Sequence, residues 1–128
     1  MRPHETAPVD AFELPEWLGV EEVTWAAESS LGTHHVAGML RAGEERRLEC
    51  DVLACDLAYP LPVLGEKWRS AAHQAWALGE ALLVTYDGRM TVVAPGTEVT
   101  VETVLEAVRR LVRAVGGSAA RFTVALRL

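Results

Sequence analysis

The stretch RRLECDVLACDL, residues 46–57, contains both cysteines of the chain. Its apolar residues follow a turn-forming segment and precede a proline-rich one, and we predict a long strand that begins at Arg46. Neighbouring side chains on a strand point to opposite faces, so Cys50 and Cys55 are expected to lie on opposite sides of the sheet. A disulfide or a shared metal ion would need a bulge in the strand. We therefore expect Cys50 to be a small core residue and Cys55 to be a partly exposed or interface thiol.

Two strands are predicted before this one, VEEVTWAAE at residues 20–28 and HHVAGMLR at residues 34–41. The connections between the three strands are short, which favours an antiparallel meander. Further upstream, ELPEWLG at residues 13–19 has apolar residues at helical spacing and predicts a short helix. Residues 1–11 show no periodicity and are interpreted as a flexible acidic tail. The rest of the chain, residues 12–128, is interpreted as a single α+β domain.

Two helices, a hairpin and a last strand are predicted after the long strand. The segment VLGEKWRSAAHQAWALGE, residues 63–80, carries apolar residues at helical spacing. In ALLVTYDGRMTVVAPG, residues 81–96, an Asp-Gly pair separates two strand-forming runs, which is typical of a type I′ hairpin turn. A second amphipathic helix is expected to begin after the N-cap Thr100 and to stop at a Gly-Gly pair. The segment ARFTVALRL at residues 120–128 alternates as a one-sided strand.

These elements predict an α+β fold in the order short α-β-β-β-α-β-β-α-β. The economical packing is an antiparallel or mixed sheet of about six strands, with the two main amphipathic helices on one face. The order is similar to that of small acidic dimeric secretion chaperones, and the final strand departs from that family. The resemblance implies a dimeric, chaperone-like protein.

The chain has 128 residues, 50% of them hydrophobic, and a net charge of −6. The acidic balance argues against nucleic-acid binding, which needs clustered lysines and arginines. No apolar run approaches the roughly 20 residues that span a bilayer, and the first residues do not resemble a signal peptide. We therefore expect a cytoplasmic protein with reduced thiols and no membrane contact. The apolar surplus indicates a surface for self-association or for a partner.

A catalytic site is not assigned from the sequence. We find no phosphate loop, no dinucleotide-binding glycine motif and no HExxH motif, and no cofactor or metal site is predicted. The candidates for a small-molecule or enzyme site are Cys55 and Asp51, together with His34 or His35. Their assembly needs one particular register between the second and third predicted strands.

Charged and aromatic residues favour a partner surface. Acidic residues dominate the first 28 residues, whereas arginines are the only charged residues after Glu106. Candidates for partner binding are Trp17, Trp25, Arg109, Arg113, Arg121 and Arg127.

We predict a small cytoplasmic, non-catalytic protein–protein interaction module of the adapter or chaperone-like type. It is expected to be a homodimer, with another protein or its own second subunit as the partner. One alternative is an immunity- or antitoxin-type inhibitor of a basic partner. The other is a small-molecule-binding protein or modest enzyme that uses His34 or His35 with Cys55 or Asp51.

Overall fold

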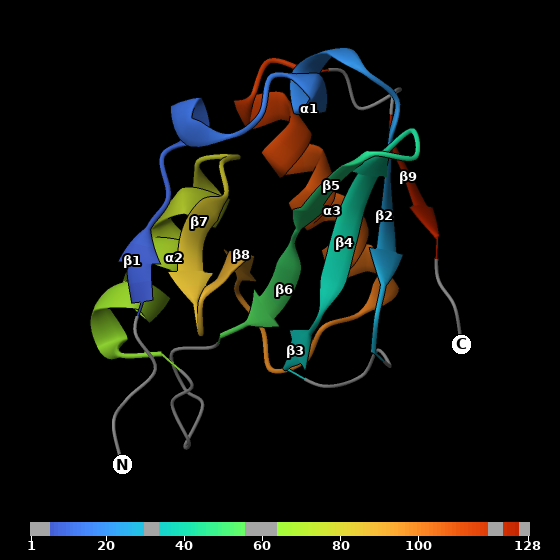
Figure 1. The fold of residues 1–128 in the computed structure, drawn as a ribbon. Coiled ribbons are helices and arrows are strands. Elements are labelled where there is room, and N and C mark those ends of the chain that lie inside the picture. Colours follow the sequence, from blue (N-terminus) through green and yellow to red (C-terminus); the bar gives the residue numbers. More distant parts are fainter. Residues whose placement is uncertain (1–5, 30–33, 56–63, 118–121, 126–128) are drawn as a thin grey trace.

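The computed structural model describes residues 6–29, 34–55, 64–117 and 122–125 (Figure 1). Along the chain the elements are β1 (Thr6–Pro8), the 3-10 helix η1 (Ala11–Glu13), α1 (Trp17–Val20), β2 (Val23–Ala27), β3 (His35–Val36), β4 (Gly38–Ala42), β5 (Arg46–Glu49), β6 (Asp51–Ala54), α2 (Glu66–Ala77), β7 (Leu82–Tyr86), β8 (Arg89–Ala94), α3 (Val101–Ala114) and β9 (Phe122–Ala125).

The described strands form two sheets. One has five strands in the order β1-β7-β8-β6-β3, and the other has four in the order β5-β4-β2-β9. Strands β2, β4 and β5 form the predicted antiparallel meander. The pairs β6 with β8 and β2 with β9 are parallel. The α+β class is confirmed, while the single sheet of about six strands is corrected to two sheets.

One bent hairpin belongs to both sheets. The half next to its turn pairs β4 with β5, with Leu40 opposite Leu48, and the half away from the turn pairs β3 with β6, with His35 opposite Leu53. The predicted long strand is interrupted at Cys50, where β5 of one sheet becomes β6 of the other. A strand that bends from one sheet to another forms a corner between two packed layers. Residues 30–33 and 56–63, which flank this hairpin, lie outside the described part of the chain.

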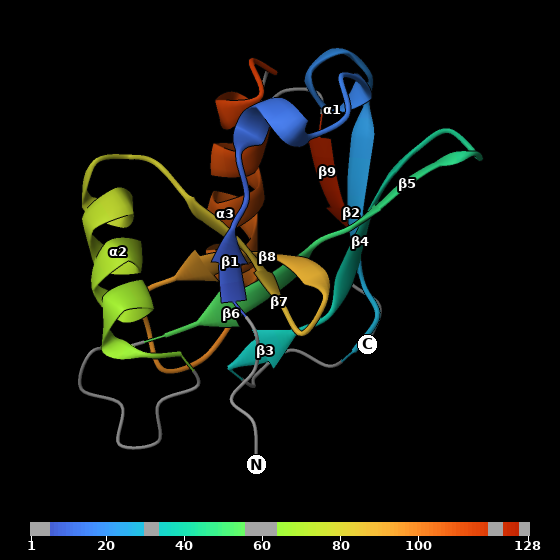
Figure 2. The same cartoon turned by 60° about the vertical axis from the view of Figure 1, so that its left-hand side comes forward.

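The two long helices pack on opposite faces of the five-stranded sheet, not on one face as predicted. Val52 of β6 and Val92 of β8 are in the same buried cluster as Val108 of α3. The next residues along both strands, Leu53 and Val93, pack in a second cluster with Ala72 of α2. Strands buried on both faces have continuous apolar runs without alternation, and β6 and β8 are both of this kind. Figure 2 shows α2 standing apart from α3, which lies beside β9.

Trp25 of β2 fills the space between the two sheets. Its side chain is fully buried, and its indole N–H donates to the carbonyl oxygen of Cys50 at 2.8 Å. Gly38 at the start of β4 makes room for the ring, because a Cβ there would lie 2.2 Å from Trp25 Cζ2. The prediction that Trp25 contributes to a partner surface is therefore corrected: the side chain belongs to the core.

The predicted flexible tail is partly a strand. Residues 6–8 form β1, which pairs antiparallel with β7 at the edge of the five-stranded sheet. Pro8 is compatible with this position because an edge strand leaves part of its backbone unpaired. Residues 1–5 of the predicted tail lie outside the described residues.

The chain then crosses the end of α3 as η1 and α1, and we call residues 10–22 the N-terminal arch (Figure 1). Leu18 inserts its side chain into the core, where it is 1% exposed. A Cβ on Gly19 would lie 2.7 Å from the carbonyl oxygen of Val115, and one on Gly117 would lie 3.1 Å from Gly19 Cα. These close backbone contacts fix the arch to the carboxyl end of α3.

Two turn and cap predictions are confirmed. Asp87 and Gly88 have φ angles of 55° and 79° between β7 and β8, as a type I′ turn requires. Thr100 caps α3, with its hydroxyl oxygen accepting the N–H of Thr103 at 3.1 Å.

Candidate functional site

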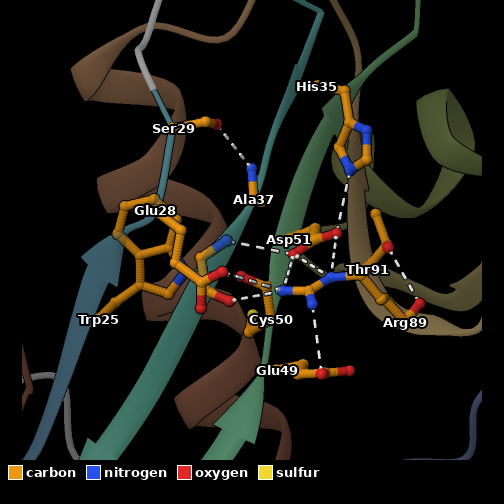
Figure 3. Close-up of polar contacts among 11 residues, drawn as sticks. Trp25, Glu28, Ser29, His35, Ala37, Glu49, Cys50, Asp51, Arg89 and Thr91 are labelled. Atoms are coloured by element: carbon orange, nitrogen blue, oxygen red, sulfur yellow. Dashed lines mark hydrogen bonds and ion pairs between the residues drawn. The ribbon is translucent and has the colours of Figure 1, made fainter.

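The largest group of interacting polar side chains in the described residues lies where the bent hairpin passes from one sheet to the other. We call it the junction cluster, and it consists of Asp51, Arg89, His35, Glu28 and Glu49 (Figure 3). Asp51 is the first residue of β6 and is fully buried. Arg89 opens β8, the strand that pairs in parallel with β6.

The Asp51 carboxylate is surrounded by donors. Arg89 Nε donates to its two oxygens at 3.1 and 2.9 Å, and Arg89 Nη2 donates to Oδ1 at 3.0 Å. His35 Nε2 lies 3.0 Å from Oδ2, and the backbone N–H of Gly38 donates to Oδ1 at 3.1 Å. Burial opposes ionisation, but the hydrogen bonds from His35, Arg89 and Gly38 hold the pKa of Asp51 below its ordinary value. The carboxylate is therefore charged and engaged by protein groups.

Arg89 connects this buried carboxylate with two acids at the surface. Its Nη1 lies 3.2 Å from Glu49 Oε1, and its Nη2 lies 3.8 Å from Glu28 Oε2. Its Nη2 also donates to the carbonyl oxygen of Gly38 at 3.4 Å. The hydrogen bonds to Asp51 raise the pKa of the guanidinium, which stays charged. Gly38, Glu49 and Asp51 belong to β4, β5 and β6, and Glu28 directly follows β2, so Arg89 connects both sheets at the hairpin bend.

The structure brings two of the proposed catalytic residues together. His35 contacts Asp51, and its ring packs edge-on against Tyr86 with the centroids 5.6 Å apart. Burial raises the pKa of Tyr86, and the neighbouring carboxylate of Asp87 acts in the same direction. His34 is half-buried, and its carbonyl oxygen accepts the backbone N–H of Ala54 at 2.7 Å.

The cysteines lie on opposite faces of the five-stranded sheet, as predicted. Cys50 packs in the cluster with Trp25 and α3, whereas Cys55 packs with Leu53 and Tyr86. Neither is in a disulfide. Cys55 is 4% exposed, which corrects the expectation of a partly exposed thiol. Burial raises the pKa of the Cys50 thiol far above its ordinary value, so Cys50 stays protonated and is a poor nucleophile.

The proposed partner-binding residues are scattered. Trp17 is half-buried on the arch and packs against the core. Arg109 and Arg113 are exposed on α3, and Arg109 pairs with Glu106 of its own helix at 2.9 Å. Arg121 and Arg127 lie outside the residues whose side chains are described.

Two large apolar side chains on the arch are exposed. Phe12 is 97% exposed and Val20 is 67% exposed. Two hollows border them. One of about 440 Å³ is lined by Phe12, Leu14 and the end of α3. The other, of about 530 Å³, is lined by Trp17, Val20, Glu21 and Arg46, and Arg46 forms an ion pair with Glu21.

The sequence did not predict the exposure of Phe12 and Val20 or the position of Arg89 at the junction cluster. Phe12 and Val20 fall outside the apolar stripe of the predicted short helix, and this mismatch was the only local sign of their exposure. Arg89 is 38 residues away from Asp51 in the sequence, and no local pattern links the two.

The chain matches no protein-family model, no curated protein and no solved structure. In the segments that the structure describes, no three histidine, cysteine, aspartate or glutamate side chains are grouped as metal ligands would be. None of the helices in these segments has both the length and the apolar character of a membrane-spanning helix.

Proposed function

We propose that this protein is a non-catalytic protein-interaction module and that the N-terminal arch is its contact surface. The observation that carries the proposal is the exposure of Phe12 and Val20 on a segment that is otherwise fixed to the core. A phenylalanine that is 97% exposed gains nothing from the folding of its own chain. Covering it with a partner would remove its apolar surface from water.

The hydrogen bonds of the junction cluster support the non-catalytic part of this proposal. Asp51 is the best candidate for acid–base chemistry, but its oxygens accept hydrogen bonds from Arg89, His35 and Gly38. A general base must reach a proton of the substrate. Asp51 is fully buried, and its oxygens accept hydrogen bonds from groups of its own chain. We infer that the cluster holds the two sheets together.

The charge of the arch indicates the kind of partner. Residues 6–22 contain five acidic residues and no lysine or arginine. The acids are Asp10, Glu13, Glu16, Glu21 and Glu22. A surface of apolar side chains among carboxylates favours a partner with a basic contact surface, because complementary charge speeds association and excludes acidic competitors. We further propose a cytoplasmic location, which the two cysteines outside any disulfide support.

The test is affinity retention of proteins from the native extract, quantified by mass spectrometry. The baits are the unchanged chain, Phe12→Ser, Val20→Ser and the control Leu78→Ser, which removes another exposed apolar side chain at the end of α2. The proposal predicts specific proteins that the unchanged chain and Leu78→Ser retain and that both arch variants lose. Equal retention by all four baits, or no specific retention by the unchanged chain, would contradict it.

A further inference from the structure

The outer side of α3 carries a stripe of apolar and basic residues, whereas the arch combines apolar and acidic residues. Val101, Leu105, Arg109 and Arg113 follow one another at intervals of four residues, so they lie along one side of the helix. Val101 is 41% exposed and Leu105 is 36% exposed, and both arginines are exposed as well. We call these four residues the α3 stripe.

The arch and the α3 stripe are complementary in chemistry. The arch offers Phe12 and Val20 among carboxylates, whereas the stripe offers Val101 and Leu105 beside guanidinium groups. The ion pair of Arg109 with Glu106 is an exposed contact between residues three positions apart. Such a pair contributes about 0.5 kcal/mol or less, so the arginine is easily redirected to another carboxylate.

The arch adjoins the basic end of the α3 stripe of its own chain but cannot cover the apolar end. The arch touches α3 at its carboxyl end, where Gly19 meets Val115 and Gly117. Val101 lies at the opposite end of a 14-residue helix, which is about 20 Å away at 1.5 Å per residue. A second copy of the chain has the same arch, which can cover this stripe.

We propose that two copies associate through reciprocal contacts, with the arch of each copy on the α3 stripe of the other. The two surfaces adjoin on each copy, and a two-fold axis pairs each surface with its complement in the other copy. Phe12 and Val20 are the apolar anchors, and the carboxylates of Glu13 and Glu16 face Arg109 and Arg113. This inference rests on the proposed function and identifies its partner as a second copy.

The test is a charge exchange followed by the mass of the particle in light scattering and sedimentation equilibrium. One variant reverses the arch charges (Glu13→Arg with Glu16→Arg), one reverses the stripe (Arg109→Glu with Arg113→Glu), and the third combines both. The unchanged chain is expected to form dimers. Each single reversal is expected to weaken dimerisation by about tenfold or more, and the combined variant to restore it, because opposite charges again face each other.

Matched controls exclude effects of net charge. Glu44→Arg with Glu45→Arg, and Arg41→Glu with Arg47→Glu, make the same changes at exposed positions on the β4–β5 hairpin. These pairs are expected to leave dimerisation unchanged, and circular dichroism checks that every variant is folded.

Three outcomes overturn the inference: a monomeric unchanged chain, reversals that act no more strongly than the controls, or a combined variant that stays monomeric. If the unchanged chain is a monomer but Phe12→Ser loses retained proteins, the dimer is wrong and the proposed function stands. If the charge exchange behaves as expected while Phe12→Ser loses no retained protein, the arch binds its own copy and the retention experiment contradicts a foreign partner.

Discussion

The junction cluster and the N-terminal arch place polar and apolar side chains in opposite ways. In the junction cluster, the buried carboxylate of Asp51 accepts hydrogen bonds from Arg89, His35 and the Gly38 amide. On the arch, the side chain of Phe12 is almost fully exposed, and the carboxylates around it outnumber basic groups. Asp51 and His35, residue types that often take part in catalysis, are hydrogen-bonded to each other, whereas the apolar side chain of Phe12 is exposed to solvent. Contacts rather than residue types therefore distinguish the junction cluster from the proposed contact surface.

The largest expected effect is the loss of the buried carboxylate. Asp51→Asn leaves Arg89 without its buried counter-charge, and breaking a buried pair in this way costs about 3–5 kcal/mol. The free energy of unfolding, measured by urea denaturation, is expected to fall by that amount. The control Glu44→Gln removes an exposed carboxylate in a turn and is expected to change it by less than about 0.5 kcal/mol. Equal effects of the two variants would show that the junction cluster does not hold the sheets together.

The same carboxylate determines how stability depends on pH. Because the pKa of Asp51 is lower in the folded protein than its ordinary value of about 3.9, its contribution is fully present above that value. The contribution is lost as the pH falls through the lower folded pKa. Acid titration of the unchanged chain is therefore expected to show a steeper loss of stability below about pH 4 than titration of Asp51→Asn. Parallel curves would contradict a lowered pKa.

The next effect concerns the packing around Trp25. Gly38→Ala places a Cβ 2.2 Å from the buried indole ring and is expected to cost about 3 kcal/mol. The control is Gly65→Ala, where a Cβ meets nothing within 4 Å and the cost is expected to be about 1 kcal/mol or less. Thermal unfolding of both variants measures the difference. A Gly38→Ala protein as stable as the control would mean that the two sheets separate easily at the bend.

The smallest expected effect on stability belongs to the arch. Phe12→Ser removes a side chain that is 97% exposed, so the free energy of unfolding is expected to change by less than about 0.5 kcal/mol. Chemical denaturation provides the measurement. A loss of about 2 kcal/mol or more would show that Phe12 packs within its own chain, and the arch would then resemble the junction cluster.

Local signals in the sequence predicted the local structure correctly. The Asp87-Gly88 turn, the Thr100 cap and the opposite directions of Cys50 and Cys55 all follow from patterns that span a few residues. The pairing of His35 with Asp51 was foreseen only as one of several possible registers, because register depends on contacts between separate strands.

The arrangement of the layers could not be predicted from those signals. The bend at Cys50 preserves the alternation of side chains, so a strand that changes sheets has the same sequence pattern as a straight one. The apolar runs in β6 and β8 are consistent with a sheet that has helices on both faces. A short apolar run is equally consistent with a buried helical segment, so it did not predict this arrangement. The sequence predicted a strand around Trp25, but no local pattern showed that both sheets would enclose its side chain.

The central claim is that the arch, and not the junction cluster, is the surface that other protein chains contact. The most direct measurement is photo-crosslinking in the cells that naturally express the protein, with a benzophenone amino acid at position 12 or, as the control, at position 78. Position 12 is predicted to give a discrete adduct, either with a second copy or with one basic protein, that position 78 does not give. The same adducts from both positions, or no discrete adduct from position 12, would contradict the account.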